Sequence, residues 1–282
     1  MKKFLKKTSL FLVTAAMTVS APLMAWALEH DIVILHTNDI HCGINDNIGF
    51  AGLAQIKKDA LARTPNVALV DAGDAIQGAP IGKLSRGLAV VDIMNYLGYD
   101  FCIPGNHEFD YGMDRFLELV PLQRAGYYCA NFVYAGNNKQ VLPGYKIMQY
   151  EDTKVAFVGA STPESLTTST PTFFQNEKGK YIYSFCEDKT GNKLYKQLQK
   201  NVDKARKDGA DYVFIVGHLG MDGTTPQWSS ESVAKNTQGV DAVIDGHSHE
   251  RFTRMVKNKV GKDVLLAQTG TKLKTVGELV IT

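Results

Sequence analysis

The sequence predicts an α/β fold, and three features of the 282-residue chain support this class. Short apolar runs rich in β-branched residues recur along the chain, amphipathic segments separate many of them, and 44% hydrophobic and 21% charged residues are typical of a globular protein. Alternation of strands and helices indicates an α/β domain. The expected strands cover residues 31–36, 67–70, 101–104, 127–132, 154–160, 212–216, 242–245, 264–268 and 276–281, and the expected helices cover residues 51–63, 88–97, 113–125 and 194–207.

The first 27 residues have the pattern of a secretory signal peptide. Four lysines are followed by an apolar stretch and by the small-residue pattern Ala25-Trp26-Ala27, which predicts cleavage after Ala27. The alternative is an uncleaved anchor, but polar residues and a proline interrupt the run before it reaches the ~20 apolar residues that a membrane span needs. We therefore expect a secreted, periplasmic or cell-surface protein, with residues 28–282 as one domain and no stable membrane span after cleavage.

Cleavage changes the charge balance of the chain. The leader contains four Lys and no Asp or Glu, so its removal lowers the basic count from 31 to 27 against 29 acidic groups, and the formal net charge becomes −2. No run of Lys and Arg with interleaved aromatic residues remains. A nucleic-acid polymer is therefore not an expected partner.

The four cysteines, Cys42, Cys102, Cys129 and Cys186, include no CxxC pair. An exported protein can form disulfides, and spacing alone cannot give their connectivity. Cys102 and Cys129 lie in apolar runs, which favours buried free thiols at these two positions.

Five of the seven histidines lie just after apolar, strand-like runs, within two residues of an Asp, Asn or Gly or, for His249, of another such histidine. In open α/β sheets, ligand sites form at the carboxyl ends of strands. Residues 161–189 interrupt the alternation with a segment rich in Ser, Thr, Pro and Lys, and excursions of this length are often functional.

Acidic residues accompany the first two of these strand ends. Asp39 and His41 are two residues apart in DIVILHTNDIHCG, which we expect to be extended here, so that both side chains project to one side. Asp74 ends the VALVDAGD block, where the preceding glycine allows a sharp turn. Each pattern alone is weak.

The FCIPGNHEFDYG block is more specific. Asn106 can provide a neutral oxygen ligand, and His107 oriented by Asp110 could transfer protons. The alternative is a turn capped by Asn106.

Two later strand ends add further imidazoles. His218 follows YVFIVG, while His247 and His249 follow DAVIDG, and two histidines at such a position favour metal binding over core packing.

Seven potential ligands exceed the four to six of one ion, so two ions are predicted. If Asp74 bridges them, each ion has four protein ligands and keeps positions for water and substrate. The mixture of oxygen and imidazole ligands fits Zn, Mn, Fe or Co better than Ca or Mg.

The blocks HTNDIH, DAGD, GNHEFD, GH and GHSH, in this order, resemble those of the calcineurin-like metallophosphoesterases, and specifically the secreted bacterial 5′-nucleotidase / 2′,3′-cyclic-nucleotide phosphodiesterase family. The resemblance implies a four-layer α/β/β/α sandwich with metals at the strand ends and hydrolysis of nucleotide phosphate esters by metal-activated hydroxide. It also implies a catalytic pair, His107 and Asp110. One ion would be held by Asp39, His41, Asp74 and His249, and the other by Asp74, Asn106, His218 and His247.

The resemblance covers the metallophosphoesterase domain only, and we expect the chain to lack the second, nucleoside-binding domain of that family. A small phosphoester, nucleotide in class, is the expected substrate. The alternatives are another phosphoesterase, a sulfur–sulfate hydrolase on the same site, or a truncated, non-catalytic metal-binding remnant.

Overall fold

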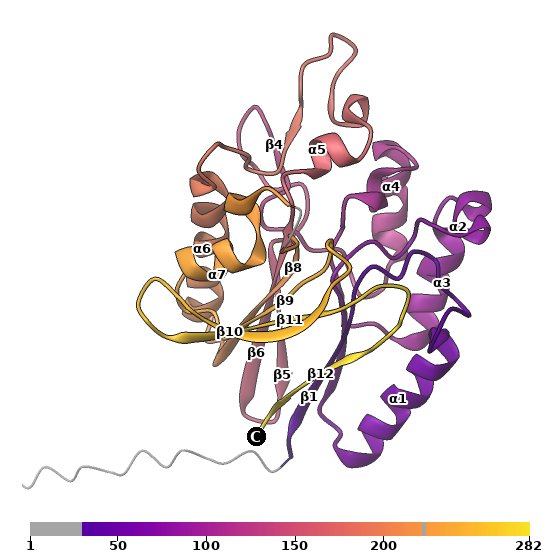
Figure 1. The fold of residues 1–282 in the computed structure, drawn as a ribbon, viewed down its shortest axis with the longest axis vertical. Helices are drawn as coiled ribbons and strands as arrows, with labels where there is room; N and C mark the ends of the chain where they lie inside the picture. Colours follow the sequence, from indigo (N-terminus) through magenta and orange to yellow (C-terminus); the bar gives the residue numbers. More distant parts are fainter. Residues whose placement is uncertain (1–29, 222–223) are drawn as a thin grey trace, which may run out of the picture.

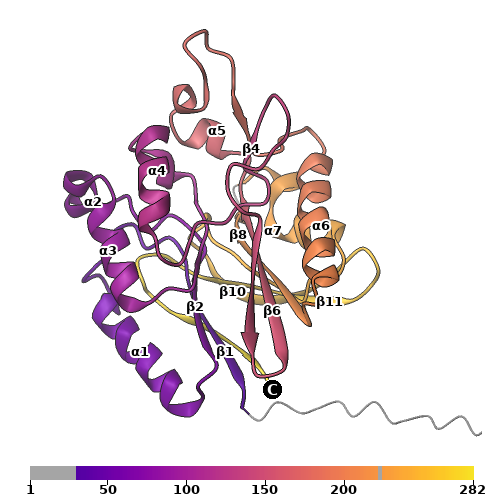
Figure 2. The same cartoon turned by 180° about the vertical axis from the view of Figure 1, so that it is seen from behind.

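The computed structural model describes residues 30–221 and 224–282, so the predicted signal peptide lies outside the described residues. Two β-sheets pack face to face, and helices cover both outer faces (Figures 1 and 2). In Figure 1, helices α1 to α4 lie on the right and helices α6 and α7 on the left. This arrangement confirms the expected four-layer α/β/β/α sandwich.

The first sheet has the strand order β12-β1-β2-β3, with β1, β2 and β3 parallel and β12 antiparallel to β1. Four helices cover its outer face. The strands are β1 (Ile32–Thr37), β2 (Val67–Asp71), β3 (Phe101–Cys102) and β12 (Gly277–Ile281), and the helices are α1 (Gly49–Arg63), α2 (Pro80–Ser85), α3 (Leu88–Leu97) and α4 (Met113–Leu119).

The second sheet has the order β10-β11-β9-β8-β6-β5, with a parallel centre and antiparallel edges. Its strands are β5 (Tyr145–Tyr150), β6 (Thr153–Ser161), β8 (Tyr212–His218), β9 (Ala242–Ile244), β10 (Arg251–Lys257) and β11 (Asp263–Thr269). The remaining elements are helices α5 (Ser165–Thr168), α6 (Asn192–Lys207) and α7 (Ser230–Asn236), the pair β4 (Val133–Tyr134) and β7 (Tyr183–Ser184), and 3₁₀ turns η1 (His107–Phe109), η2 (Val120–Leu122), η3 (Pro171–Phe174) and η4 (Pro226–Trp228).

Alternation along the strands divides the interior into three cores. In β1, Val33 and Leu35 pack with the helices of the first sheet, whereas Ile32 and Ile34 pack between the two sheets. The third core lies between the second sheet and helices α6 and α7. The face of α6 formed by Leu194, Leu198, Val202 and Ala205 is buried there.

One expected strand, residues 127–132, is wrong. Only Tyr127 forms a bridge, with Cys102, and the following backbone N–H groups bond to three different segments: Tyr128 to Cys102, Cys129 to Pro143 and Ala130 to Gly159. The run is buried and apolar because it crosses the interior, but it has no single strand partner.

All four cysteines are free and buried. This finding confirms the interpretation of Cys102 and Cys129 as buried free thiols.

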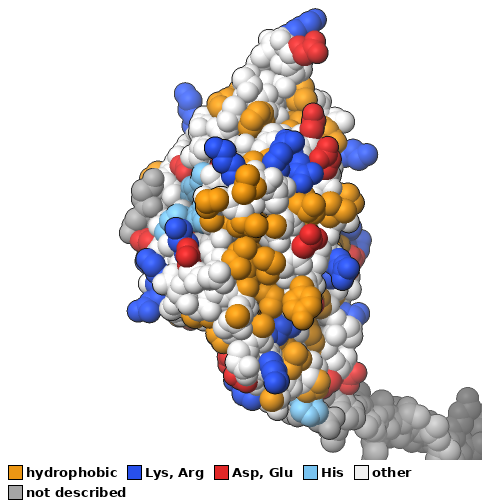
Figure 3. All heavy atoms as spheres, turned by 90° about the vertical axis from the view of Figure 1, so that its right-hand side faces the viewer, with side chains coloured by type: hydrophobic (Ala, Val, Ile, Leu, Met, Phe, Trp, Pro, Cys, Tyr) orange, Lys and Arg blue, Asp and Glu red, His pale blue; other side chains and the backbone are white. Residues whose placement is uncertain are grey.

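Apolar atoms are also visible on the outer surface of helices α1 to α4 (Figure 3). Within the described ranges, no helix has both the length and the apolar character needed to cross a membrane. Large exposed apolar side chains on these helices and on η2 are Leu61, Ile81, Leu84, Tyr96 and Leu122.

Phe109 provides a test of the first core. Its ring is fully buried, with centroids 4.8 to 5.7 Å from those of Phe116, Phe132, Phe174 and Phe185. We expect Phe109→Ala to lower the free energy of unfolding by about 3–5 kcal/mol, because it removes these contacts and leaves a cavity.

Urea denaturation measures the change. The control is Tyr96→Ala, since Tyr96 is 91% exposed and its loss should change stability by less than about 0.5 kcal/mol. Equal effects of the two substitutions would contradict the packing described.

Candidate metal centre

The parallel strands bring the motif-bearing loops of both sheets together. The loops after β1 and β2 are joined by backbone hydrogen bonds from Asp39 to Gly73 and from His41 to Asp74, both 2.9 Å long. Asp39, His41 and Asp74 have positive φ angles of 50°, 48° and 58°. The expectation of an extended segment at Asp39–His41 is therefore wrong, since the chain turns there, although the two side chains still converge.

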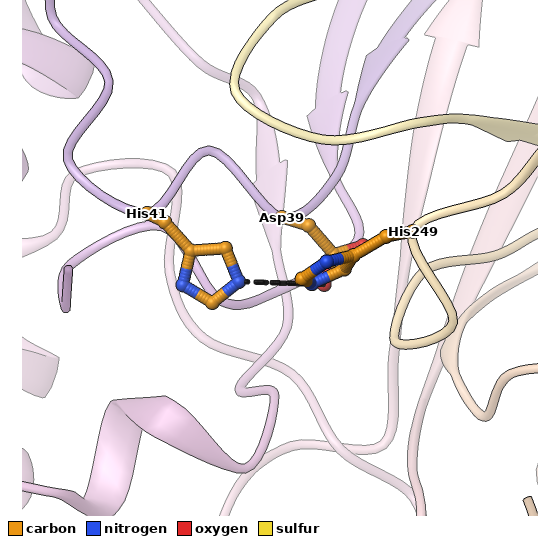
Figure 4. Close-up of side chains that lie close together, drawn as sticks. All are labelled: Asp39, His41 and His249. Atoms are coloured by element: carbon orange, nitrogen blue, oxygen red, sulfur yellow. Dashed lines mark hydrogen bonds and ion pairs between the residues drawn. The ribbon is translucent and has the colours of Figure 1, made fainter.

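Two groups of acidic and imidazole side chains have ligand atoms within 4.8 Å of one another. The first contains Asp39, His41 and His249, with His249 Nε2 3.2 Å from Asp39 Oδ1 and 3.1 Å from His41 Nε2. Figure 4 shows the His41 ring directed edge-first toward that of His249. Asp39 and His41 come from the loop after β1 and His249 from the loop before β10.

The second group contains Asp39, Asp74 and His218. His218 Nε2 lies 3.1 Å from Asp74 Oδ2, which is also 3.9 Å from His41 Nε2. Asp39 is common to both groups, and Asp74 contacts a histidine of each. The two groups therefore form one continuous cluster.

Hydrogen bonds to main-chain carbonyls orient two of these rings. His218 Nδ1 lies 2.7 Å from the Ala72 carbonyl oxygen, and His41 Nδ1 lies 3.2 Å from that of Gln77. A carbonyl oxygen can only accept, so each Nδ1 carries a proton, and in the neutral form of each ring the Nε2 lone pair is directed toward the carboxylates. Histidine ligands of metals are commonly oriented in this way.

Two buried polar atoms at the site make no hydrogen bond to any described residue, although most buried polar atoms do. One is His218 Nε2, which lies 3.1 Å from the Asp74 carboxylate. The other is Oδ1 of Asn106, which precedes His107, the residue whose backbone N donates to Asp74. Asp39 and Asp74 are 0% and 1% exposed, and buried carboxylates are normally paired or bound to metal. A divalent cation would satisfy all four groups, so the donor set fits a metal with mixed oxygen and nitrogen ligands.

The charge of the cluster also favours a cation. Burial lowers the pKa of His218, but the Asp74 and Asp39 carboxylates outweigh this effect and raise it to about 10. Burial likewise raises the pKa of Asp74, yet His218, His107 and His41 bring it well below its usual range. The site therefore stabilises positive charge, whether it is a proton on His218 or a metal ion.

His247 lies beside this cluster but belongs to neither close group. Its backbone N donates to Asp39 Oδ2 at 2.9 Å, and its ring centroid is 5.0 Å from that of His218. Its Nε2 faces Glu164 Oε2 at 3.1 Å. The structure thus places His247 next to the other predicted ligands with one ring nitrogen directed elsewhere.

His107 and Asp110 form a close pair at the edge of the cluster. Their Nδ1 and Oδ2 atoms are 2.6 Å apart, and this hydrogen bond raises the pKa of His107 to about 9 against the opposing effect of burial. The His107 side chain is 33% exposed, so a protonated imidazole faces solvent. Ser169, from the 161–189 excursion, donates from Oγ to Asp110 Oδ1 at 3.1 Å.

Sequence reasoning missed Glu108, which is 1% exposed. Its carboxylate accepts hydrogen bonds from the backbone N–H groups of two loops, and burial raises its pKa to about 7. Its position inside GNHEFD, directly after the predicted catalytic His107, is the sequence feature that could have pointed to a role for this residue. The donors are Asp74 (2.8 Å), Ala75 (2.8 Å), Ile76 (3.3 Å) and Gly105 (2.6 Å).

We expect Glu108→Gln to lower the free energy of unfolding by about 3 kcal/mol, because an amide NH₂ would face backbone donors that then lose their acceptor. Metal content of the folded variant should fall too, since Asp74 and Gly105 are no longer held together. Urea denaturation and elemental analysis measure these effects.

The matched control is Glu118→Gln, because the Glu118 side chain is 63% exposed. Wild-type stability in Glu108→Gln would show that Glu108 does not join the loops.

Comparisons with known proteins place this geometry in a family. A family model described as Calcineurin-like phosphoesterase matches residues 32–251. The chain is 29% identical over 259 residues to the snake venom 5′-nucleotidase of Gloydius brevicauda, covering 85% of this chain and 40% of the relative. It is 27% identical over 272 residues to the 2′,3′-cyclic-nucleotide 2′-phosphodiesterase/3′-nucleotidase of Haemophilus influenzae, with the same coverage.

Among solved structures, a 5′-nucleotidase precursor from Thermus thermophilus superposes with a TM-score of 0.74 at 26% identity, over 89% of this chain and 51% of that one. The chain spans about 40% of the length of the curated relatives it matches. The family match covers most of the described residues, including all of the motif blocks. The chain therefore belongs to the calcineurin-like phosphoesterase family.

Proposed function

We propose that this protein is an exported hydrolase of nucleotide phosphate esters that uses two divalent metal ions. The observation that carries the proposal is the convergence of two buried carboxylates and three imidazoles beside a protonated His107. The buried Oδ1 of Asn106, the residue before His107, has no hydrogen-bond partner in the described part of the chain and supports it. One ion would be held by Asp39, His41, Asp74 and His249, and the other by Asp74, Asn106, His218 and His247.

The metal identity remains among Zn, Mn, Fe and Co, since mixed oxygen and imidazole ligands suit these ions. Bound ions would supply positive charge that stabilises the phosphoryl transition state and lowers the pKa of water toward 7. At the leaving oxygen of the phosphate ester, the contribution of the chain itself is the His107–Asp110 pair.

His107 is suited to act as the general acid. With its pKa raised to about 9, the imidazole carries a proton at neutral pH. Asp110 holds Nδ1 at 2.6 Å, which leaves the Nε2 proton for the leaving ester oxygen. The side chains of His107 and His249 are 33% and 45% exposed, so a substrate can reach both from solvent.

The nucleotide part of the proposal rests on the relatives, two of which are named as nucleotide hydrolases. Export rests on the leader pattern in residues 1–27. Both are consistent with residues 28–282 acting as one secreted or periplasmic catalytic domain on a small phosphoester.

The test is a substrate panel of AMP, 2′,3′-cyclic AMP and an aryl phosphate, with protein stripped by a chelator and then supplied with Mn²⁺ or Zn²⁺. We expect phosphate release from at least one nucleotide after metal is restored and none before, because phosphoryl charge is then uncompensated. Hydrolysis of the aryl phosphate alone would contradict nucleotide specificity, and metal-independent turnover would contradict the metal mechanism.

His107→Ala should keep its metal ions but lose about 10²- to 10⁴-fold in turnover, the usual contribution of general acid catalysis. Steady-state kinetics with elemental analysis on the same sample separates the two effects. His30→Ala is the control, since His30 precedes β1 and, among the described residues, its ring pairs with Glu151 and its backbone oxygen accepts from Asn66. An unchanged rate in His107→Ala would remove His107 from the mechanism.

A further inference from the structure

A carboxylate outside all of the motif blocks contacts the candidate metal centre. Glu164 directly precedes α5, three residues beyond the end of β6. Its Oε2 lies 3.1 Å from His247 Nε2, and its Oε1 accepts from the Thr225 backbone N at 2.6 Å and from Thr225 Oγ1 at 2.5 Å. Both oxygens are engaged and the side chain is 16% exposed, so its position is well determined.

The ring of His247 is held on several sides. Its backbone N is anchored to Asp39 Oδ2 at 2.9 Å. The ring packs on Gly220, where a Cβ would lie 3.0 Å from His247 Cδ2, so no larger residue fits without displacing the ring. The contact with Glu164 then determines the direction in which Nε2 of the ring points.

The proton on this ring follows from its partner. An ionised carboxylate can only accept a hydrogen bond, so His247 Nε2 must donate to Glu164. A neutral imidazole with its proton on Nε2 has its one lone pair on Nδ1. This differs from His218, whose Nδ1 faces the Ala72 carbonyl and whose Nε2 is left without a hydrogen bond.

We propose that Glu164 is a positioning residue for the metal centre: it fixes the tautomer and orientation of His247, so that Nδ1 is the nitrogen presented to a divalent cation. This inference rests on the proposed function, because it concerns His247 as a ligand. Glu164 is not among the proposed metal ligands, and its side chain contacts Thr225 and His247. It acts through His247 in the way that carboxylates beside histidine ligands commonly do.

The direct test uses Glu164→Gln, which retains the size of the side chain but places an amide beside His247. We expect titration of the chelator-stripped protein with Mn²⁺ to show a 10- to 100-fold weaker second binding step. The first step should keep its wild-type affinity, because its proposed ligands do not include His247.

A matched variant separates this role from a general effect on structure. Glu187→Gln alters another carboxylate of the same excursion, which accepts from Ser184 and Phe185 away from the centre. It should bind two equivalents of Mn²⁺ with wild-type affinity.

A measurement on the unsubstituted protein avoids any folding defect of a variant. Nitrogen-15 NMR of the stripped protein, with the His247 signals assigned, should show a protonated Nε2 and an unprotonated Nδ1. The opposite tautomer would overturn the inference, as would wild-type Mn²⁺ affinities in Glu164→Gln or equal weakening in Glu187→Gln. Failure of the wild-type protein to bind Mn²⁺ or release phosphate would instead overturn the proposed function, and it would be seen before any substitution.

Discussion

The burial of two carboxylates at the strand ends is the constraint on which the rest of the structure depends. Asp39 and Asp74 are 0% and 1% exposed, and an unpaired charge in such surroundings would be strongly destabilising. Main-chain donors from distant segments compensate, since the His247 N–H bonds to Asp39 and the His107 N–H bonds to Asp74. The approach is so close at Gly105 that a Cβ would lie 2.2 Å from Asp74 Oδ1, which excludes every other residue type there.

Two other buried carboxylates, those of Glu108 and Asp245, accept hydrogen bonds from the backbone of the loops that carry the candidate ligands. Glu108 connects the loops after β2 and β3, and Asp245 accepts from the Leu219 and Gly220 N–H groups, connecting the loops after β8 and β9. Burial raises the pKa of both carboxyl groups. The positions of the candidate ligands therefore depend on two residues that are not ligands themselves. Hydrogen bonds from the backbone to these carboxylates hold the loops at a fixed distance from one another.

Sequence patterns predicted the features that repeat along one element and missed those that depend on distant partners. The helical face of α6 and the apolar strands before each motif follow from local periodicity. The edge strand β10 was not expected because five of its seven residues are exposed and three are charged, and edge strands often carry charge. Residues 127–132 were wrongly predicted to be a strand, because a buried apolar segment has the same sequence pattern whether or not it pairs with a neighbouring strand. Glu108 and Glu164 could not be given roles, since the backbone and ring atoms they contact are brought near them only by the fold.

The candidate ligands are spread over nearly the whole length of the domain. His41 contacts His249, and Asp39 contacts His247, although the two residues of each pair are 208 positions apart in the sequence. A growing chain on the ribosome therefore holds its early acidic residues long before the last imidazoles have been synthesised. The complete set of ligands exists only once both sheets have packed together, so metal loading must follow translation and folding, and an exported chain would take its ions from the compartment in which it folds.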